Sequence, residues 1–217
     1  MVVGGHKIVW GIAGWGLSLA MGVGPVFAID VKISMEEASK ALEAGRIPMD
    51  KANSPEDVKK VLQQASMETR VGADPENDPC GASAVLRTKR YRLEAFGRQE
   101  SSESKKRKTE IRMPEEFIKK VIDMPNMEVE VQLCGDDEYF AEGAVIELQQ
   151  GSKRVKPIDI GKAERGRKNE GNGPAYRSRF TAVFAYESFD PIAQSVFVIN
   201  LMDGKEVRIN ADFSKVK

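Results

Sequence analysis

The stretch AYRSRFTAVFAYESFDPIAQSVFVINLMDGKEVRINADFSKV, residues 175–216, decides the fold. In its first part, aromatic side chains at even-numbered positions share one face: Tyr176, Phe180, Phe184 and Tyr186. Arg177 and Arg179 stand between them and belong to the opposite face. Alternation with a period of two residues is typical of a strand that is buried on one side.

The second part of this stretch predicts a hairpin. Residues 196–201 form a nearly continuous apolar strand, and Asp203 with Gly204 follows soon after. Asp-Gly favours a two-residue hairpin turn because glycine tolerates a positive φ. Apolar and polar side chains alternate again over residues 207–213. The whole stretch therefore predicts three consecutive antiparallel strands, with a turn at Asp190 and Pro191 between the first two.

More strands are predicted upstream, at residues 84–97, 127–133, 140–149 and 153–157. A short helix is expected to begin at Pro114, and residues 99–108 are expected to be a polar, solvated loop. Strands and helices do not alternate regularly, so six or seven strands predict a mainly β fold. We expect an antiparallel β-sandwich, or a partly open barrel, with one inserted helix.

Two short helices are predicted ahead of the sheet. Ser34 and Glu37 match a capping box at the start of the first helix, which is expected to end at Gly45. Ser54 followed by Pro55 opens the second helix. Each helix is too short to be stable alone in water, so the pair is expected to pack as an N-terminal helical hairpin.

The N-terminus has the pattern of a signal peptide. A single basic residue, Lys7, precedes an apolar run, and Val26 and Ala28 fit a cleavage site before Ile29. The alternative is an uncleaved membrane anchor, because the run is nearly long enough to span a bilayer. The expected organisation is a signal peptide at residues 1–28, a helical hairpin segment at 29–80 and an antiparallel β-domain at 81–217.

Histidine is nearly absent, and this restricts the chemistry. The one histidine, His6, lies in the predicted signal peptide. The mature chain would therefore lack Ser-His-Asp and Cys-His catalysis and any histidine-ligated metal. We expect no catalytic residues, no metal site and no cofactor. An enzyme that uses carboxylate, lysine or tyrosine chemistry stays open as an alternative.

The chain has two cysteines, Cys80 and Cys134. An even pair in an exported chain predicts one disulfide, which would stabilise the fold by about 4 kcal/mol in the chain-entropy model. The alternative is a pair of free thiols, because sequence alone does not show that the two Cα atoms approach each other.

Charge is balanced overall, with 33 Lys and Arg against 33 Asp and Glu, but it is unevenly distributed. Residues 87–112 hold ten basic and four acidic residues, and a second basic group follows at residues 153–168. If strand faces and loops converge, the basic residues would attract an anionic partner. The candidate binding residues are Arg87, Lys89, Arg90, Arg92, Lys105, Lys106, Arg107, Lys108, Arg177 and Arg179. The alternative is a set of solvated basic loops that acids elsewhere balance.

These patterns favour an exported binding or interaction protein, periplasmic or extracellular. Its expected partner is an anionic surface or polymer, or another envelope protein, and not an intracellular nucleic acid. Two alternatives stay open: a histidine-free enzyme, and a structural envelope component that assembles through sheet edges.

Overall fold

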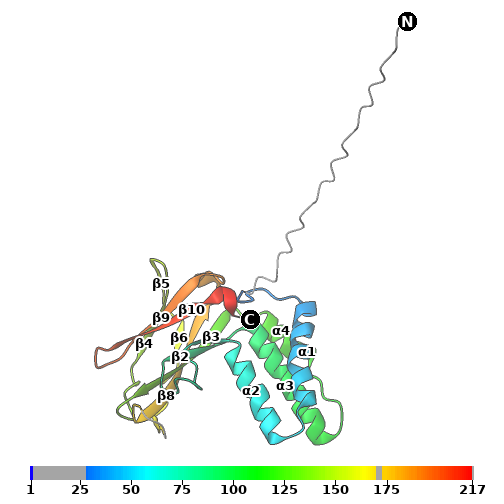
Figure 1. The fold of residues 1–217 in the computed structure, drawn as a ribbon, viewed down its shortest axis with the longest axis horizontal. Helices are drawn as coiled ribbons and strands as arrows, with labels where there is room; N and C mark the ends of the chain where they lie inside the picture. Colours follow the sequence, from blue (N-terminus) through cyan, green and yellow to red (C-terminus); the bar gives the residue numbers. More distant parts are fainter. Residues whose placement is uncertain (2–27, 170–172, 217) are drawn as a thin grey trace.

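The computed structural model of the protein describes Met1 and residues 28–169 and 173–216. The predicted signal peptide falls almost wholly on residues 2–27, outside the described residues, and its cleavage stays a prediction. Figure 1 shows two layers of strands on one side and a group of helices on the other. Among the described helices, none is both long enough and apolar enough to cross a membrane.

Two antiparallel sheets form the sandwich. The larger sheet has the order β1 (Arg70–Gly72), β2 (Ser83–Arg87), β3 (Asn126–Gly135), β8 (Tyr176–Ala185) and β6 (Asp159–Ile160), and β7 (Arg167–Lys168) also pairs with β8. The smaller sheet has the order β10 (Glu206–Asp212), β9 (Gln194–Asn200), β4 (Val145–Gln150) and β5 (Lys153–Val155). The predicted mainly β antiparallel sandwich is confirmed, and the described strands close no barrel.

The core lies between the two sheets, where the even-numbered face of β8 meets β9 and the C-terminal segment. Phe184 and Phe197 are fully buried with ring centroids 5.9 Å apart, and Phe213 lies 6.1 Å from Phe197. The predicted hairpin is present: Gly204 has φ of 85°, and β10 pairs with β9 along its whole length. The strand predicted at residues 140–149 begins five residues later than expected, because residues 139–143 form turns.

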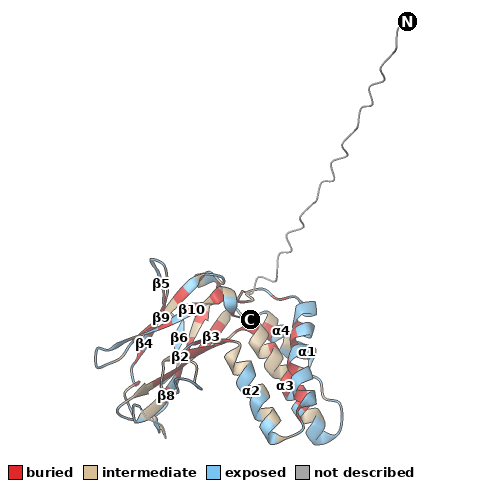
Figure 2. Cartoon of the chain, in the orientation of Figure 1, coloured by how far each residue is buried: buried red, intermediate tan, exposed pale blue. Residues whose placement is uncertain are grey.

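In the described part of the chain, four helices pack beside the sandwich: α1 (Met35–Lys51), α2 (Pro55–Met67), α3 (Lys89–Arg107) and α4 (Glu115–Ile122). Figure 2 shows their buried residues gathered where α1, α3 and α4 face one another. The capping box at Ser34, the helix start at Ser54 and the helix after Pro114 are confirmed. Because α1 packs along α3, residues from both sides of the predicted boundary at residue 81 share one apolar cluster. The division into two domains stays a prediction.

The strand predicted over residues 84–97 and the loop predicted over residues 99–108 are wrong. The strand β2 ends at Arg87, and the Thr88 side chain then accepts a hydrogen bond from the Tyr91 amide at 3.1 Å and caps α3. The alternation of Tyr91, Leu93 and Ala95 resembled a strand because α3 buries few apolar side chains. Its buried residues are Lys89, Leu93, Gly97, Arg98, Glu100 and Ser101.

The predicted end of α1 at Gly45 is also wrong, because the helix continues to Lys51. Gly45 does not cap the helix; it lets α1 pack closely against α3. A Cβ atom there would lie 1.9 Å from the Glu94 carbonyl oxygen, and one at Gly97 would lie 1.9 Å from the Leu42 carbonyl oxygen. Beside this crossing, Arg46 Nε donates to the buried Glu100 carboxylate at 3.1 Å. The two helices therefore pack backbone to backbone through their glycines.

Replacing Gly97 with alanine should destabilise the protein. In an exposed helix this change stabilises by up to about 1 kcal/mol, since alanine is the better helix former. At Gly97 the added methyl overlaps α1, so we expect the free energy of unfolding to fall by about 1–3 kcal/mol in urea denaturation. The matched control is Ser102→Ala, at an exposed position of α3. This change should alter the free energy of unfolding by less than about 0.5 kcal/mol. A stabilising Gly97→Ala would contradict the close helix contact.

Candidate functional site

The outer face of the larger sheet carries most of its polar side chains. On β3 and β8, the residues that alternate with the buried ones point away from the core. In the strand register, Arg179 lies opposite Gln132, and Thr181 lies opposite Glu130. Arg177 lies opposite Cys134 at the end of the pairing. The same alternation that builds the core therefore places two of the predicted binding residues on one outer face.

Two adjoining hollows lie over this face. The first, of about 500 Å³, is lined by Pro79, Glu164, Arg167, Lys168, Asn169, Arg177 and Arg179. The second, of about 370 Å³, is lined by Arg87, Glu130, Lys162, Glu164, Arg179, Phe180 and Thr181. They share Glu164 and Arg179, and we call them together the basic trough. Six of the lining side chains are cationic and two are carboxylates.

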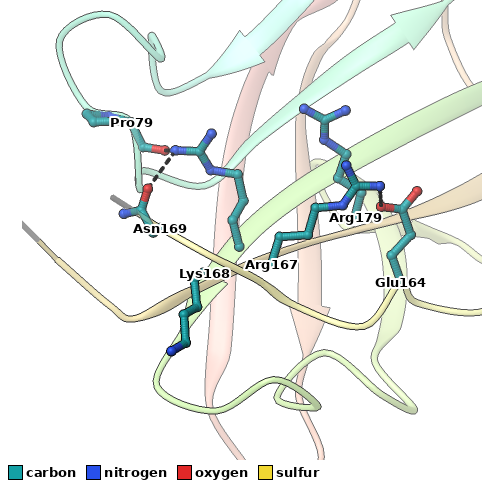
Figure 3. Close-up of a pocket in the computed structure, with 7 residues that line it drawn as sticks. Pro79, Glu164, Arg167, Lys168, Asn169 and Arg179 are labelled. Carbon is teal, nitrogen blue, oxygen red and sulfur yellow. Dashed lines mark hydrogen bonds and ion pairs between the residues drawn. The ribbon is translucent and has the colours of Figure 1, made fainter. Parts of the chain in front are cut away.

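Arg177 is held at one end of the trough by neutral acceptors. Its Nη2 atom donates to the Pro79 carbonyl oxygen and to the Asn169 Oδ1 atom, each at 3.1 Å (Figure 3). No carboxylate among the described residues forms an ion pair with Arg177, and its buried Nε has no hydrogen-bond partner among them. Fixed in place but not neutralised, this guanidinium is well suited to meet an anion.

Further cations surround the shared part of the trough. Arg179 donates to Gln132 at 3.3 Å and lies 3.7 Å from a Glu130 carboxylate oxygen, so it is partly neutralised. Behind it, burial lowers the pKa of Arg70, and the positive charge of Arg179 lowers it further. Lys162 and Lys168 form no ion pair with any described residue. The trough therefore keeps a positive excess that the surrounding residues do not cancel.

The disulfide lies next to one end of the trough, in contact with the lining residue Asn169. Cys80 and Cys134 are bonded with their Cα atoms 5.3 Å apart, which confirms the predicted bridge. Asn169 Nδ2 donates to the Cys80 sulfur at 3.0 Å, and its Oδ1 accepts from Arg177. The bridge thus ties the segment that carries Pro79 to β3 and keeps it beside Arg177. A disulfide of this kind indicates a non-reducing environment, as expected for an exported protein.

Three of the predicted binding residues, Arg87, Arg177 and Arg179, line the trough. Arg87 lies at its far end, where it pairs with Glu130 and donates to Glu128 at 2.7 Å. Arg92 donates to the same Glu128 at 2.7 Å. Carboxylates thus neutralise the charge at this end more fully than at the Arg177 end.

Two other predicted binding residues, Arg90 and Lys89, join parts of the fold. Arg90 donates to Asp30 at 2.6 Å. Lys89 is buried, and its Nζ donates to the Ile122 carbonyl oxygen at the end of α4 while lying 5.3 Å from the centre of the Tyr186 ring. Burial lowers the pKa of Lys89. Both side chains connect the helices to the segments around the sandwich.

The basic run Lys105, Lys106, Arg107 and Lys108 lies at the other end of α3, a helix of 19 residues and so about 28 Å long. Lys105 Nζ donates to the carbonyl oxygens of Met49 and Ala52 at 2.6 and 2.7 Å and so caps the end of α1. All four residues of the run are exposed. The structure therefore does not bring this run together with the residues of the trough.

Three cations of the trough were not among the candidate residues: Lys162, Arg167 and Lys168. They belong to the second basic group in the sequence. The signal that could have found them is the loop rich in glycine, lysine and arginine directly before the strand that carries Arg177, because such a loop can fold back along that strand. In the structure it does so, since Arg167 lies opposite Arg177 in the pairing of β7 with β8.

Comparison with known proteins gives no relative. No family model, no curated protein and no solved structure matches the chain.

Replacing both cysteines with alanine should loosen the Arg177 end of the trough. We expect the free energy of unfolding to fall by about 2–4 kcal/mol, because the bridge closes a loop of 54 positions. Amide hydrogen exchange should speed up in residues 73–82, which contain no buried residue, and change less in the paired strand β10. Unchanged exchange in residues 73–82 would show that the bridge does not hold this segment in place.

Proposed function

We propose that the protein is an exported binding protein, periplasmic or extracellular, that engages an anionic partner through the basic trough. The observation that carries this proposal is the charge of the trough, where six cationic side chains face two carboxylates. A concave surface lined mainly by one sign of charge focuses the electric field and attracts the opposite charge. The disulfide supports export, because such bridges persist in oxidising compartments.

The geometry favours binding at the trough over binding at the end of α3. In the trough, Arg177 is oriented by two hydrogen bonds, and Lys162 and Lys168 are free of ion pairs with described residues. At the end of α3, Lys105 is occupied as a helix cap, and Arg107 donates to Glu103 at 3.2 Å. The trough therefore offers more uncompensated charge on a more rigid support, which lowers the entropy cost of binding.

Charge reversal at two positions of each cluster tests the proposal. The variant Arg167→Glu with Lys168→Glu changes exposed side chains of β7, whose pairing with β8 runs through the backbone. The matched control is Lys106→Glu with Lys108→Glu, an equal charge change at the exposed end of α3. The measurement is binding to dextran sulfate and to vesicles with anionic lipid, over a range of salt concentrations.

We expect affinity for at least one of these probes to fall steeply with salt, because bound cations release counterions. The trough variant should bind about tenfold more weakly, and the control should change by less than about twofold. A larger effect of the control would move the site to α3. Binding that ignores salt, or no binding at low salt, would refute the proposal.

A further inference from the structure

We infer that the ligand of the basic trough is a linear acidic polysaccharide that lies along β8. This inference rests on the proposed function and adds the chemical class of the ligand. Three observations carry it: the length of the trough, the carboxylates within it, and the absence of exposed aromatic rings among its described lining residues.

The trough is long enough to hold several repeating units. At one end, Arg177 lies between Pro79 and Asn169. At the other end, Arg87 lies opposite Glu128, which in turn lies opposite Val183. From the level of Arg177 to that of Val183, β8 advances six residues, or about 20 Å. Cations occur along this whole length, so an extended chain with repeated negative charges can contact more of them than a compact anion can.

Two carboxylates lie among the cations of the trough, and they indicate that the ligand also carries hydrogen-bond donors. The Glu164 Oε2 atom lies 3.9 Å from Arg167 Nη2, which is too far for a hydrogen bond. The Glu164 side chain is 55% exposed. Its oxygens therefore keep capacity to accept hydrogen bonds from a ligand. Glu130, in the second hollow, is a second carboxylate, but it already pairs with Arg87 and lies near Arg179. A chain of phosphates offers no donors and would be repelled by both carboxylates, whereas a sugar acid offers anionic groups together with hydroxyl donors.

Nucleic acid and membrane surfaces fit the trough less well. Proteins that bind single strands usually stack bases on aromatic side chains. Among the described residues, the one aromatic side chain that lines the trough is Phe180, which is 4% exposed and faces the core. A membrane surface is flat on this scale and would not reach the floor of a hollow between β8 and residues 162–169. A narrow, flexible, hydroxyl-rich chain needs no aromatic ring to stack on, and it can reach the floor of the hollow.

The first test is the dependence of affinity on chain length, measured by titration calorimetry of the intact protein with galacturonic acid oligomers. We expect the monomer to bind at least about tenfold more weakly than an oligomer that spans the trough, with a plateau once the trough is filled. Equal affinity of monomer and oligomer would overturn the inference. So would tighter binding of single-stranded DNA or of anionic vesicles than of the longest oligomer.

The second test is Glu164→Ala, measured with the oligomer and with polyphosphate of equal charge. The backbone bonds of Glu164 to Arg179 and Ser178 do not involve its side chain, so the variant should keep the fold. If the carboxylate accepts from sugar hydroxyls, affinity for the oligomer should fall about fivefold while affinity for polyphosphate rises. The control Glu142→Ala, an exposed acid outside the trough, should change neither.

The outcomes separate this inference from the proposed function. If Glu164→Ala strengthens the binding of both ligands, the carboxylate acts only by repulsion, and the sugar-acid assignment fails while the anion site stands. The same conclusion follows if polyphosphate binds the unaltered protein as tightly as the oligomer does. If neither ligand binds, and dextran sulfate and anionic vesicles fail as well, the proposed function itself is wrong.

Discussion

The rest of the structure depends on the pairing of β3 with β8, which runs without interruption over ten residues of each strand. One face of this pair supplies Met127, Val129 and Phe184 to the core, where all three are fully buried. The other face supplies Glu130, Arg177 and Arg179 to the trough. Because side chains alternate strictly along a strand, a shift of register by one residue would bury the charges and expose the core. The apolar core therefore fixes where the charges of the outer face lie.

Ion pairing within the outer face explains how a chain with balanced charge can still carry a basic trough. The carboxylates of Glu128 and Glu130 are shared among Arg87, Arg92 and Arg179. These contacts neutralise the end of the sheet nearest the helices. At the opposite end Arg177 has neutral partners, and the loop before β8 adds cations of its own. Local positive charge thus comes from the order in which acids and bases are placed along the strands, and not from composition.

The sequence allowed most of the sheet to be predicted, because its strands are buried on one face and show this as a period of two. It did not allow α3 to be predicted, for a physical reason. The face that α3 turns toward α1 carries Gly97 and Ser101 and the charged residues Arg98 and Glu100, in place of the apolar stripe that usually marks a helix. Close backbone contact and buried ion pairs stabilise this interface. Neither of these contacts can be recognised from the pattern of hydrophobic residues in the sequence.

The candidate site could be predicted only in part, for a related reason. A count of basic residues does not separate a lysine that caps a helix, such as Lys105, from an arginine that faces solvent without a carboxylate, such as Arg177. That distinction depends on contacts between residues far apart in the chain, as in the 98 positions that separate Arg177 from Pro79. The cysteines were the exception, since an even pair in an exported chain has few other roles.

Holding several cations together without full neutralisation has a cost that the fold must offset. Burial lowers the pKa of Arg70, and repulsion by the neighbouring charge of Arg179 lowers it further. The disulfide and the Asn169 hydrogen bonds oppose this repulsion by fixing the segment that carries Pro79. An anion bound in the trough would relieve the repulsion only in the folded state, so its binding would be coupled to the stability of the protein. The covalent bridge and the proposed binding site are therefore linked, because the bridge fixes the segment that lies beside Arg177.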